Sequence, residues 1–373
     1  MNALRLSVAA TTALMLSAST LAAQALGTGI PTKPGETGSR VGLSGATFLE
    51  IPIGAREIAL GGAAAASTDG LTALFWNTAA TADIRGPSVS VSFNDLYGGS
   101  GLKQTYAAFA VPLGDIGVIG LSFNYFTSGE IIATTEAFPE GGDPTAGGTV
   151  SWDGYAAGLH FARRLTDRLA VGLAGKYVSD GITFARASWV ALDASTVFRT
   201  GLLGTTIGAS LTNLGTTSHY DGPAVEAVVT RDRDVFPVTR DVDVKFKMKD
   251  VPLPAMAQFA IATQIIGGPE ALLPNMGTNN GLTLNAAVAT GNDRAIQPIA
   301  GLEYRFHDVF FARVGKRFYM PSDGPWSYSY GLAGGVGLKL PVMGRHFTFD
   351  YATSYMGSTD LPATNTFTFQ YGY

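Results

Sequence analysis

The chain has 373 residues, of which 14% are charged and 10% aromatic, with a formal net charge of −4 at pH 7 and a mean hydropathy of +0.19. It holds 47 glycines, about 13% of its residues against a usual ~7%, and no cysteine. This composition excludes a disordered chain, a disulfide framework or thiolate metal site, and the basic surface that nucleic acid requires.

Residues 1–25 predict an export signal. Arg5 precedes a mostly apolar run from Leu6 to Leu21, and the small-residue triplet Ala23-Gln24-Ala25 follows. This order of charge, apolar run and cleavage triplet is typical of a signal peptide. We therefore expect an exported protein.

After residue 25, no apolar run is long enough for a membrane-spanning helix, which needs about 20 residues. The longest candidate, Ile58 to Ala66, has nine residues and contains Gly61-Gly62. A closed β-barrel is the remaining way to satisfy every backbone group within lipid. The sequence therefore predicts a barrel surrounded by outer-membrane lipid.

The N-terminal third carries a dense motif, SGATFLEIPIGAREIALGGA over residues 44–63, followed by ALFWNTA over residues 73–79. This motif resembles the PorV/PorQ family of outer-membrane proteins, within the FadL-like barrel superfamily. The motif residues that we assign to the hatch are Gly54, Ala55, Arg56, Gly61, Gly62, Asp69, Trp76 and Asn77. The sequence departs from the family pattern at residues 78–80, Thr-Ala-Ala in place of Pro-Ala-Gly.

The resemblance implies that residues 26–85 form an N-terminal extension and a hatch folded inside the barrel. Gly61-Gly62 and the alanines at 63–66 suit close packing against a wall. A buried Arg56 needs a charged partner, and Asp69 is one candidate. A salt bridge from hatch to wall and a ligand contact are the two roles considered for Arg56.

Residues 86–373 are predicted to form the barrel, because segments of about ten residues with alternating hydrophobicity recur between turns. In 297–307, for example, Leu302, Tyr304 and Phe306 alternate with Glu303 and Arg305. We count about fourteen antiparallel strands in an all-β membrane protein, at 87–94, 103–112, 116–126, 149–163, 168–178, 185–199, 204–214, 254–266, 280–290, 297–307, 308–318, 328–340, 346–355 and 364–373. The last strand ends on an aromatic residue, Tyr373, which resembles the signal read by the outer-membrane assembly machinery.

Connections between these segments alternate between short and long. Long surface loops are expected at 127–148 and 215–252, and a hairpin above the membrane is expected within 225–250. The opposite series consists of short turns, apart from the Pro269–Asn279 segment. This alternation is typical of bacterial barrels, with short periplasmic turns and longer surface loops.

Alternation also predicts which charges face the lumen. Glu303 and Arg313 should lie opposite each other on adjacent strands, a favourable pair. The expected lumen charges are Lys176, Asp193, Glu303, Arg305, Arg313, Arg317 and Asp350.

The sequence predicts neither an enzyme nor a cofactor or metal site. Histidines stand at 160, 219, 307 and 346, scattered over separate segments. The chain contains no H-E-x-x-H, no G-x-S-x-G and no phosphate-binding loop.

Three functions are considered. By resemblance, the first is an accessory of protein secretion of the type IX kind, which binds exported cargo or the translocon through its surface loops. The second is a FadL-like transporter that binds a hydrophobic ligand and carries it across the outer membrane. A water-filled porin agrees least with a lumenal hatch.

Overall fold

The computed structural model describes residues 42–372 except 144–147, 232–239, 275, 277–278, 320–330 and 356–360. The predicted signal peptide, residues 26–41 of the predicted N-terminal extension, and Tyr373 lie outside the described residues. Within them, no helix has the length and apolar character needed to cross a membrane.

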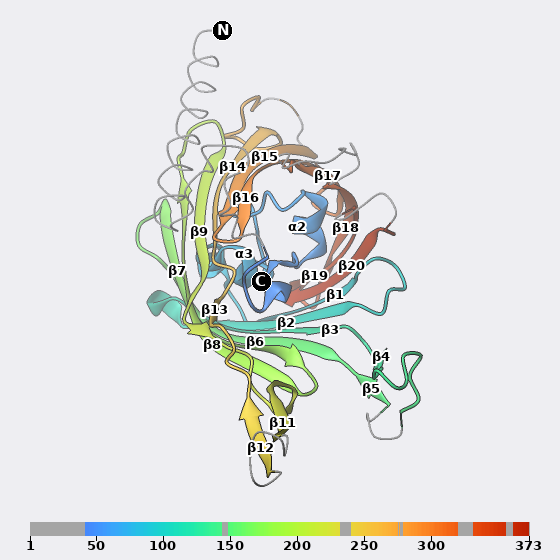
Figure 1. Ribbon diagram of the computed structural model, residues 1–373. Coiled ribbons are helices and arrows are strands. Elements are labelled where there is room, and N and C mark those ends of the chain that lie inside the picture. The colour runs from blue at the N-terminus through green and yellow to red at the C-terminus, as the bar shows by residue number, and fades with distance from the viewer. Residues whose placement is uncertain are drawn as a thin grey trace, which may run out of the picture.

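Fourteen antiparallel strands close into one barrel, in which neighbours in the chain are neighbours in the wall and the last strand pairs with the first (Figure 1). The predicted fourteen-stranded membrane barrel is therefore confirmed. Its strands are β1 (Ser88–Asp95), β2 (Lys103–Pro112), β3 (Val118–Thr127), β6 (Trp152–Arg164), β7 (Leu169–Ile182), β8 (Ala185–Arg199), β9 (Thr205–Gly215), β14 (Met256–Ile266), β15 (Asn280–Gly291), β16 (Arg294–Phe306), β17 (Phe310–Arg317), β18 (Leu332–Val342), β19 (Arg345–Ser354) and β20 (Thr364–Gly372).

The outer surface of the wall carries the apolar side chains that the alternation predicts. Leu302, Tyr304 and Phe306 are exposed on β16, while Glu303 between them is buried. Aromatic side chains of adjacent strands meet on this surface, as Phe123, Tyr155 and Tyr177 do. Every second residue therefore faces lipid, as the bilayer requires.

The two ends of the barrel differ. We call the end with the short connections at 113–117, 165–168, 200–204, 307–309 and 343–344 the turn end, and the opposite end the loop end. At the loop end lie three small two-stranded sheets, β4 (Ile131–Ile132) with β5 (Thr149–Val150), β10 (Thr217–Ser218) with β13 (Val251–Pro252), and β11 (Glu226–Arg231) with β12 (Arg240–Lys245).

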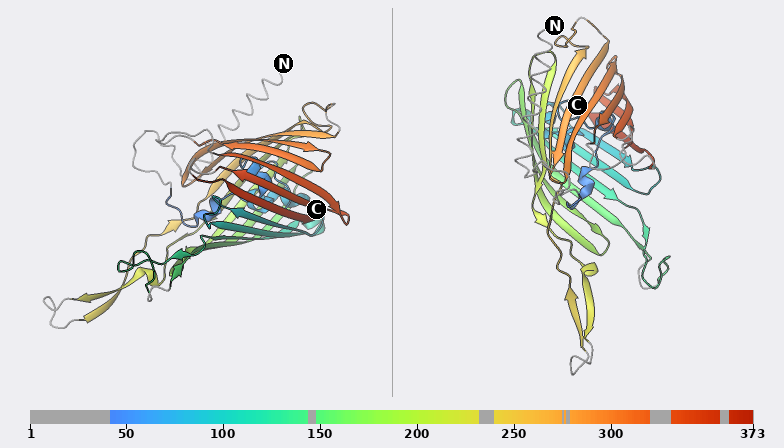
Figure 2. Two further views of the ribbon diagram at one scale, coloured as in Figure 1. Left: turned by 90° about the vertical axis from the view of Figure 1, so that its right-hand side faces the viewer. Right: turned by 45° about the horizontal axis from the view of Figure 1, so that its top comes forward.

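The β11–β12 hairpin projects well beyond the barrel rim (Figure 2). It lies within the segment where the sequence predicts a hairpin above the membrane. Short 3₁₀ turns occur at η3 (Gly114–Ile116) and η4 (Pro223–Val225).

Residues 42–87 lie inside the ring of strands (Figure 1). They form η1 (Thr47–Glu50), α2 (Ala55–Ala59), α3 (Ala73–Trp76) and η2 (Thr78–Asp83). We call this segment the hatch. It begins at the loop end, where the Gly45 amide donates to the Pro252 carbonyl 2.9 Å away, and ends at the turn end, where Asp83 pairs with Arg164 and Arg199.

Candidate functional site

The hatch packs against the wall where the wall has no side chains. Gly301 and Gly315 are opposite each other on β16 and β17, and both face Leu60. A Cβ at Gly301 would lie 2.7 Å from the Leu60 carbonyl oxygen. Glycines within these strands thus mark the close approach of another backbone.

The paired glycines of the motif end helix α2. Gly61 and Gly62 have φ of +70° and +90°, values that residues with a side chain rarely adopt. Their amides donate to the carbonyls of Ile58 and Glu57, 2.8 and 2.9 Å away. This cap turns the chain sharply against β17.

The other motif residues hold the hatch together and to the wall. Gly54, with φ of +88°, precedes α2, and the Ala55 amide donates to Thr368 Oγ1 at 2.8 Å. Trp76 Nε1 donates to the Ile53 carbonyl at 2.7 Å. Asn77 Nδ2 donates to the carbonyls of Ala65 and Thr196, and its Oδ1 accepts from the Ala79 amide, which caps η2.

A buried ladder of charges joins α2 to three strands. Arg56 Nε lies 2.9 Å from Glu303 Oε2, and Arg313 Nε lies 2.7 Å from the same oxygen. Arg313 Nη1 in turn lies 2.5 Å from Asp350 Oδ1. A buried arginine requires such partners, so the ladder fixes the position of α2 in the lumen.

Two more carboxylates adjoin the ladder. Asp69 Oδ1 lies 3.6 Å from Arg56 Nη1 and is half exposed. Glu57 is fully buried and accepts hydrogen bonds from Thr68 and Thr72. Burial raises the pKa of Glu57 to about 7, although the adjacent Arg56 opposes the shift.

The remaining predicted lumen charges lie away from the ladder. Lys176 Nζ and Asp193 Oδ2 form a separate pair at 2.6 Å, beside a bulge between β8 and β9. Arg305 pairs with Asp308 at the turn end. Arg317 is near the loop end and donates through Nε to the Gly61 carbonyl at 3.2 Å.

Sequence reasoning missed several polar contacts between hatch and wall. His160 lies between Thr78 of the hatch and Ser122 of β3. Gln258 accepts from the Ala65 amide and donates to the Gly62 carbonyl. Gln258 faces inward by strand alternation, so that pattern could have identified it.

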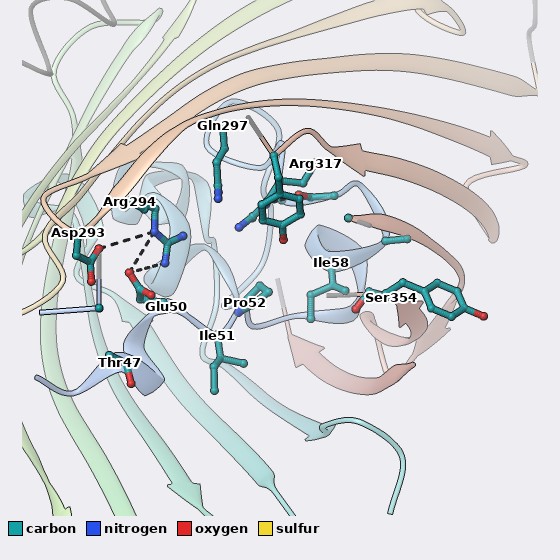
Figure 3. A pocket seen from close by; sticks show the side chains of 17 residues that line it. Thr47, Glu50, Ile51, Pro52, Ile58, Asp293, Arg294, Gln297, Arg317 and Ser354 are labelled. Atoms are coloured by element: carbon teal, nitrogen blue, oxygen red, sulfur yellow. Dashed lines mark hydrogen bonds and ion pairs between the residues drawn. The ribbon is translucent and has the colours of Figure 1, made fainter. Parts of the chain in front are cut away.

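An amphipathic cavity of about 430 Å³ lies between the hatch and the loop ends of β16–β19 (Figure 3). We call it the outer cavity. Hatch residues Ile51, Pro52 and Ile58 line one side, and Arg294 and Arg317 extend from the wall on the other. Its volume falls in the range of ligand pockets, and its mixed lining resembles theirs.

The polar side of the outer cavity contains an ion pair. Glu50 of the hatch pairs with Arg294, whose Nε lies 3.1 Å from Glu50 Oε1. Burial raises the pKa of Glu50 to about 7, while Arg294 works in the opposite direction. The described residues contain no group of three side chains suited to hold a metal ion.

A second cavity, of about 380 Å³, lies at the turn end. We call it the inner cavity. Charged side chains line it, among them Arg56, Asp69 and Arg305. Residues 62–66 of the hatch run between the two cavities, because Gly62 lines the outer one and Ala66 the inner one.

These features define a membrane-spanning β-barrel with a hatch in its lumen and a cavity facing the surface loops. Solved structures share this fold, and two toluene transporters are among them. The toluene transporter TodX of Pseudomonas putida is 11% identical, with 85% of this chain and 97% of that chain covered and a TM-score of 0.52. The toluene transporter TbuX of Ralstonia pickettii is 12% identical, with 86% of this chain and 98% of that chain covered and a TM-score of 0.52.

The chain therefore shares the barrel fold of these two transporters, whereas the FadL-like and PorV/PorQ resemblances stay predictions. No protein-family model matches the sequence, and no match was found among curated proteins.

Proposed function

We propose that this protein is an outer-membrane transporter that admits hydrophobic compounds from the cell surface. The outer cavity is the observation that carries this proposal, because it combines an apolar side with a few polar groups and faces the surface loops. The fold shared with two toluene transporters supports the same function. Transport then requires the hatch residues 62–66 to move, since they separate the outer from the inner cavity.

A disulfide that locks the hatch tests this proposal. The chain contains no cysteine, so an introduced pair is the sole thiol pair. Ala59 of the hatch and Gly335 of β18 are suitable, because a Cβ at Gly335 would lie 2.8 Å from that of Ala59. This is shorter than the usual ~3.8 Å between disulfide Cβ atoms, and a Cβ at Gly335 would also overlap the Tyr351 carbonyl oxygen, so both the hatch and the wall at β18 must shift slightly. The single Gly335→Cys variant measures the effect of the shift in the wall by itself.

The assay is uptake of a radiolabelled alkylbenzene by cells that produce the Ala59→Cys, Gly335→Cys double variant. We expect uptake to fall to the level of cells without the protein under oxidising conditions and to return after reduction. Each single cysteine variant serves as control. Uptake that is unaffected by oxidation, with the disulfide shown to have formed, would refute the proposal.

A second candidate is the role in protein secretion that the sequence resemblance implies. The projecting β11–β12 hairpin favours it, because an exposed hairpin of this kind offers a surface for a protein partner. The test is affinity purification from solubilised membranes with the parent chain and a chain lacking residues 226–245. Loss of a secretion component or exported protein with the hairpin would support this function, and recovery of neither with the parent chain would refute it.

A further inference from the structure

The charges that line the outer cavity balance one another. Glu50 and Asp293 contribute two carboxylates, and Arg294 and Arg317 contribute two guanidinium groups. Arg294 lies beside both carboxylates, as Figure 3 shows. A carboxylate ligand would bring a third acidic group beside Glu50, whose charged form burial already disfavours, and beside the buried Asp293.

Two oxygen atoms on the lining side chains have neither a hydrogen-bond partner nor an ion pair within the described part of the chain. They are Gln297 Oε1 and Ser354 Oγ, whereas Asp293 Oδ1 lies 4.0 Å from Arg294 Nε. Ser354 is 4% exposed. Such buried atoms are costly when unpaired, and each one calls for a physical explanation.

These atoms can reach a ligand by small movements. Gln297 and Ser354 point toward the cavity in Figure 3. Rotation of the Gln297 amide, a broad and roughly two-fold torsion, or a change of Ser354 to another staggered rotamer presents the oxygen to the cavity. A ligand with a hydrogen-bond donor would satisfy them, whereas a hydrocarbon would leave them unpaired.

The opposite side of the cavity offers an apolar surface. Ile58 is 3% exposed, and Ile51 and Pro52 lie beside it along the hatch. Burial of apolar ligand surface here is favourable by about 25 cal/mol per Å². The complementary ligand is therefore apolar over most of its length, with a polar group at one end.

We propose that the outer cavity binds neutral compounds that join an apolar body to a hydroxyl group, such as alkylphenols and long-chain alcohols, in preference to hydrocarbons and carboxylates. A hydroxyl donates to one unpaired oxygen and accepts from the Arg317 guanidinium or the Gln297 amide. This assignment of a ligand class rests on the proposed transport function.

The test compares three ligands of one shape, namely 4-octylphenol, octylbenzene and 4-octylbenzoate. Their binding to the purified chain in lipid nanodiscs is measured by displacement of radiolabelled 4-octylphenol, with empty nanodiscs to correct for partitioning. We expect the phenol to bind about tenfold more tightly than either analogue, which corresponds to about 1.4 kcal/mol and is at the upper end for one net hydrogen bond.

The double variant Gln297→Leu, Ser354→Ala should lose this preference and bind octylbenzene as tightly as the phenol. Ser90→Ala is the matched control, because Ser90 Oγ is also buried without a partner but lies outside the cavity lining. Heat-modifiable migration on gels verifies that each barrel is folded.

The outcomes separate the ligand class from the transport function. Octylbenzene or octylbenzoate binding as tightly as the phenol to the parent chain would overturn the ligand class, as would a preference that survives in the double variant. Absence of binding by all three would also overturn it. The transport function is judged independently by the locked-hatch uptake assay, which uses an alkylbenzene and does not depend on the hydroxyl.

Discussion

Replacement of Arg56 by methionine should loosen the hatch without unfolding the barrel. The substitution keeps an apolar stem but removes the guanidinium that contacts Glu303 through two hydrogen bonds, of 2.9 and 3.1 Å. It also removes the donor to the Ser67 carbonyl, 2.7 Å away. The strand ladder of the wall does not involve Arg56, so the barrel itself should persist.

The free-energy cost of removing Arg56 depends on which partners Glu303 retains. Breaking a buried ion pair by removing one partner costs about 3–5 kcal/mol. Glu303 keeps Arg313 at 2.7 Å, which places the cost near the lower end, at about 3 kcal/mol. At 1.36 kcal/mol per decade, the open population of the hatch should rise by about two orders of magnitude.

Hydrogen exchange measures this population directly, because protected amides exchange through local opening. Peptides covering residues 55–66 should exchange about a hundredfold faster in Arg56→Met than in the parent, while peptides from β7 and β8 stay unchanged. Arg305→Met is the matched control, because its partner Asp308 is largely exposed and such pairs contribute about 0–1 kcal/mol. A change below about fivefold in Arg56→Met would refute the idea that the ladder holds the hatch.

Two further predictions use the same exchange measurement. The pKa of Glu57 is raised to about 7 in the seated hatch, so its contribution to the stability of the seated hatch is complete below the pKa of a free glutamate, about 4.3, and is lost as the pH rises toward 7. Between pH 5 and 7, Glu57→Gln should therefore lower the slope of the logarithm of the hatch-opening constant against pH by about one, after correction for intrinsic exchange rates. An unchanged slope would contradict this assignment. Gly315→Val should speed exchange at residues 58–62 at least about fivefold, since its Cβ would overlap the Leu60 backbone and overpacking costs about 1–3 kcal/mol. Gly175→Val, whose Cβ would have nothing within 4 Å, should have no effect. Equal behaviour of the two variants would show that hatch packing does not require glycine at position 315.

The strands could be predicted from the sequence because lipid imposes a strict alternation on the wall. The predicted segments at 103–112 and 185–199, for example, coincide with β2 and β8. The start of β16 was missed by three residues, since the predicted segment begins at 297 and the strand begins at Arg294. Arg294 points into the lumen to Glu50, a contact that alternation within one strand does not reveal.

The path of the hatch could not be predicted in this way. Its contacts join residues far apart in sequence, such as Ala55 with Thr368. Several of these contacts involve glycine, which has no side chain and so gives no signal in a pattern of alternating apolar and polar residues. Alternation across the 307–309 turn did indicate that Glu303 faces Arg313, and the structure places them 2.7 Å apart. That Arg56 reaches the same carboxylate depends on the tertiary position of α2.

The two candidate functions differ in whether α2 and the residues that follow it must move. Ile58 and Gly62 line the outer cavity, whereas Arg56 lines the inner one, so a compound that passes between the cavities must displace this part of the hatch. Such displacement breaks the two hydrogen bonds of Gln258, at about 0.5–1.5 kcal/mol each, in addition to the ion pair of Arg56. Docking of a protein partner at the β11–β12 hairpin requires none of these changes. The Ala59→Cys, Gly335→Cys variant should therefore lose uptake when oxidised but still bind a protein partner. The chain lacking residues 226–245 should lose partner binding, and these two variants together distinguish a transporter from a secretion accessory.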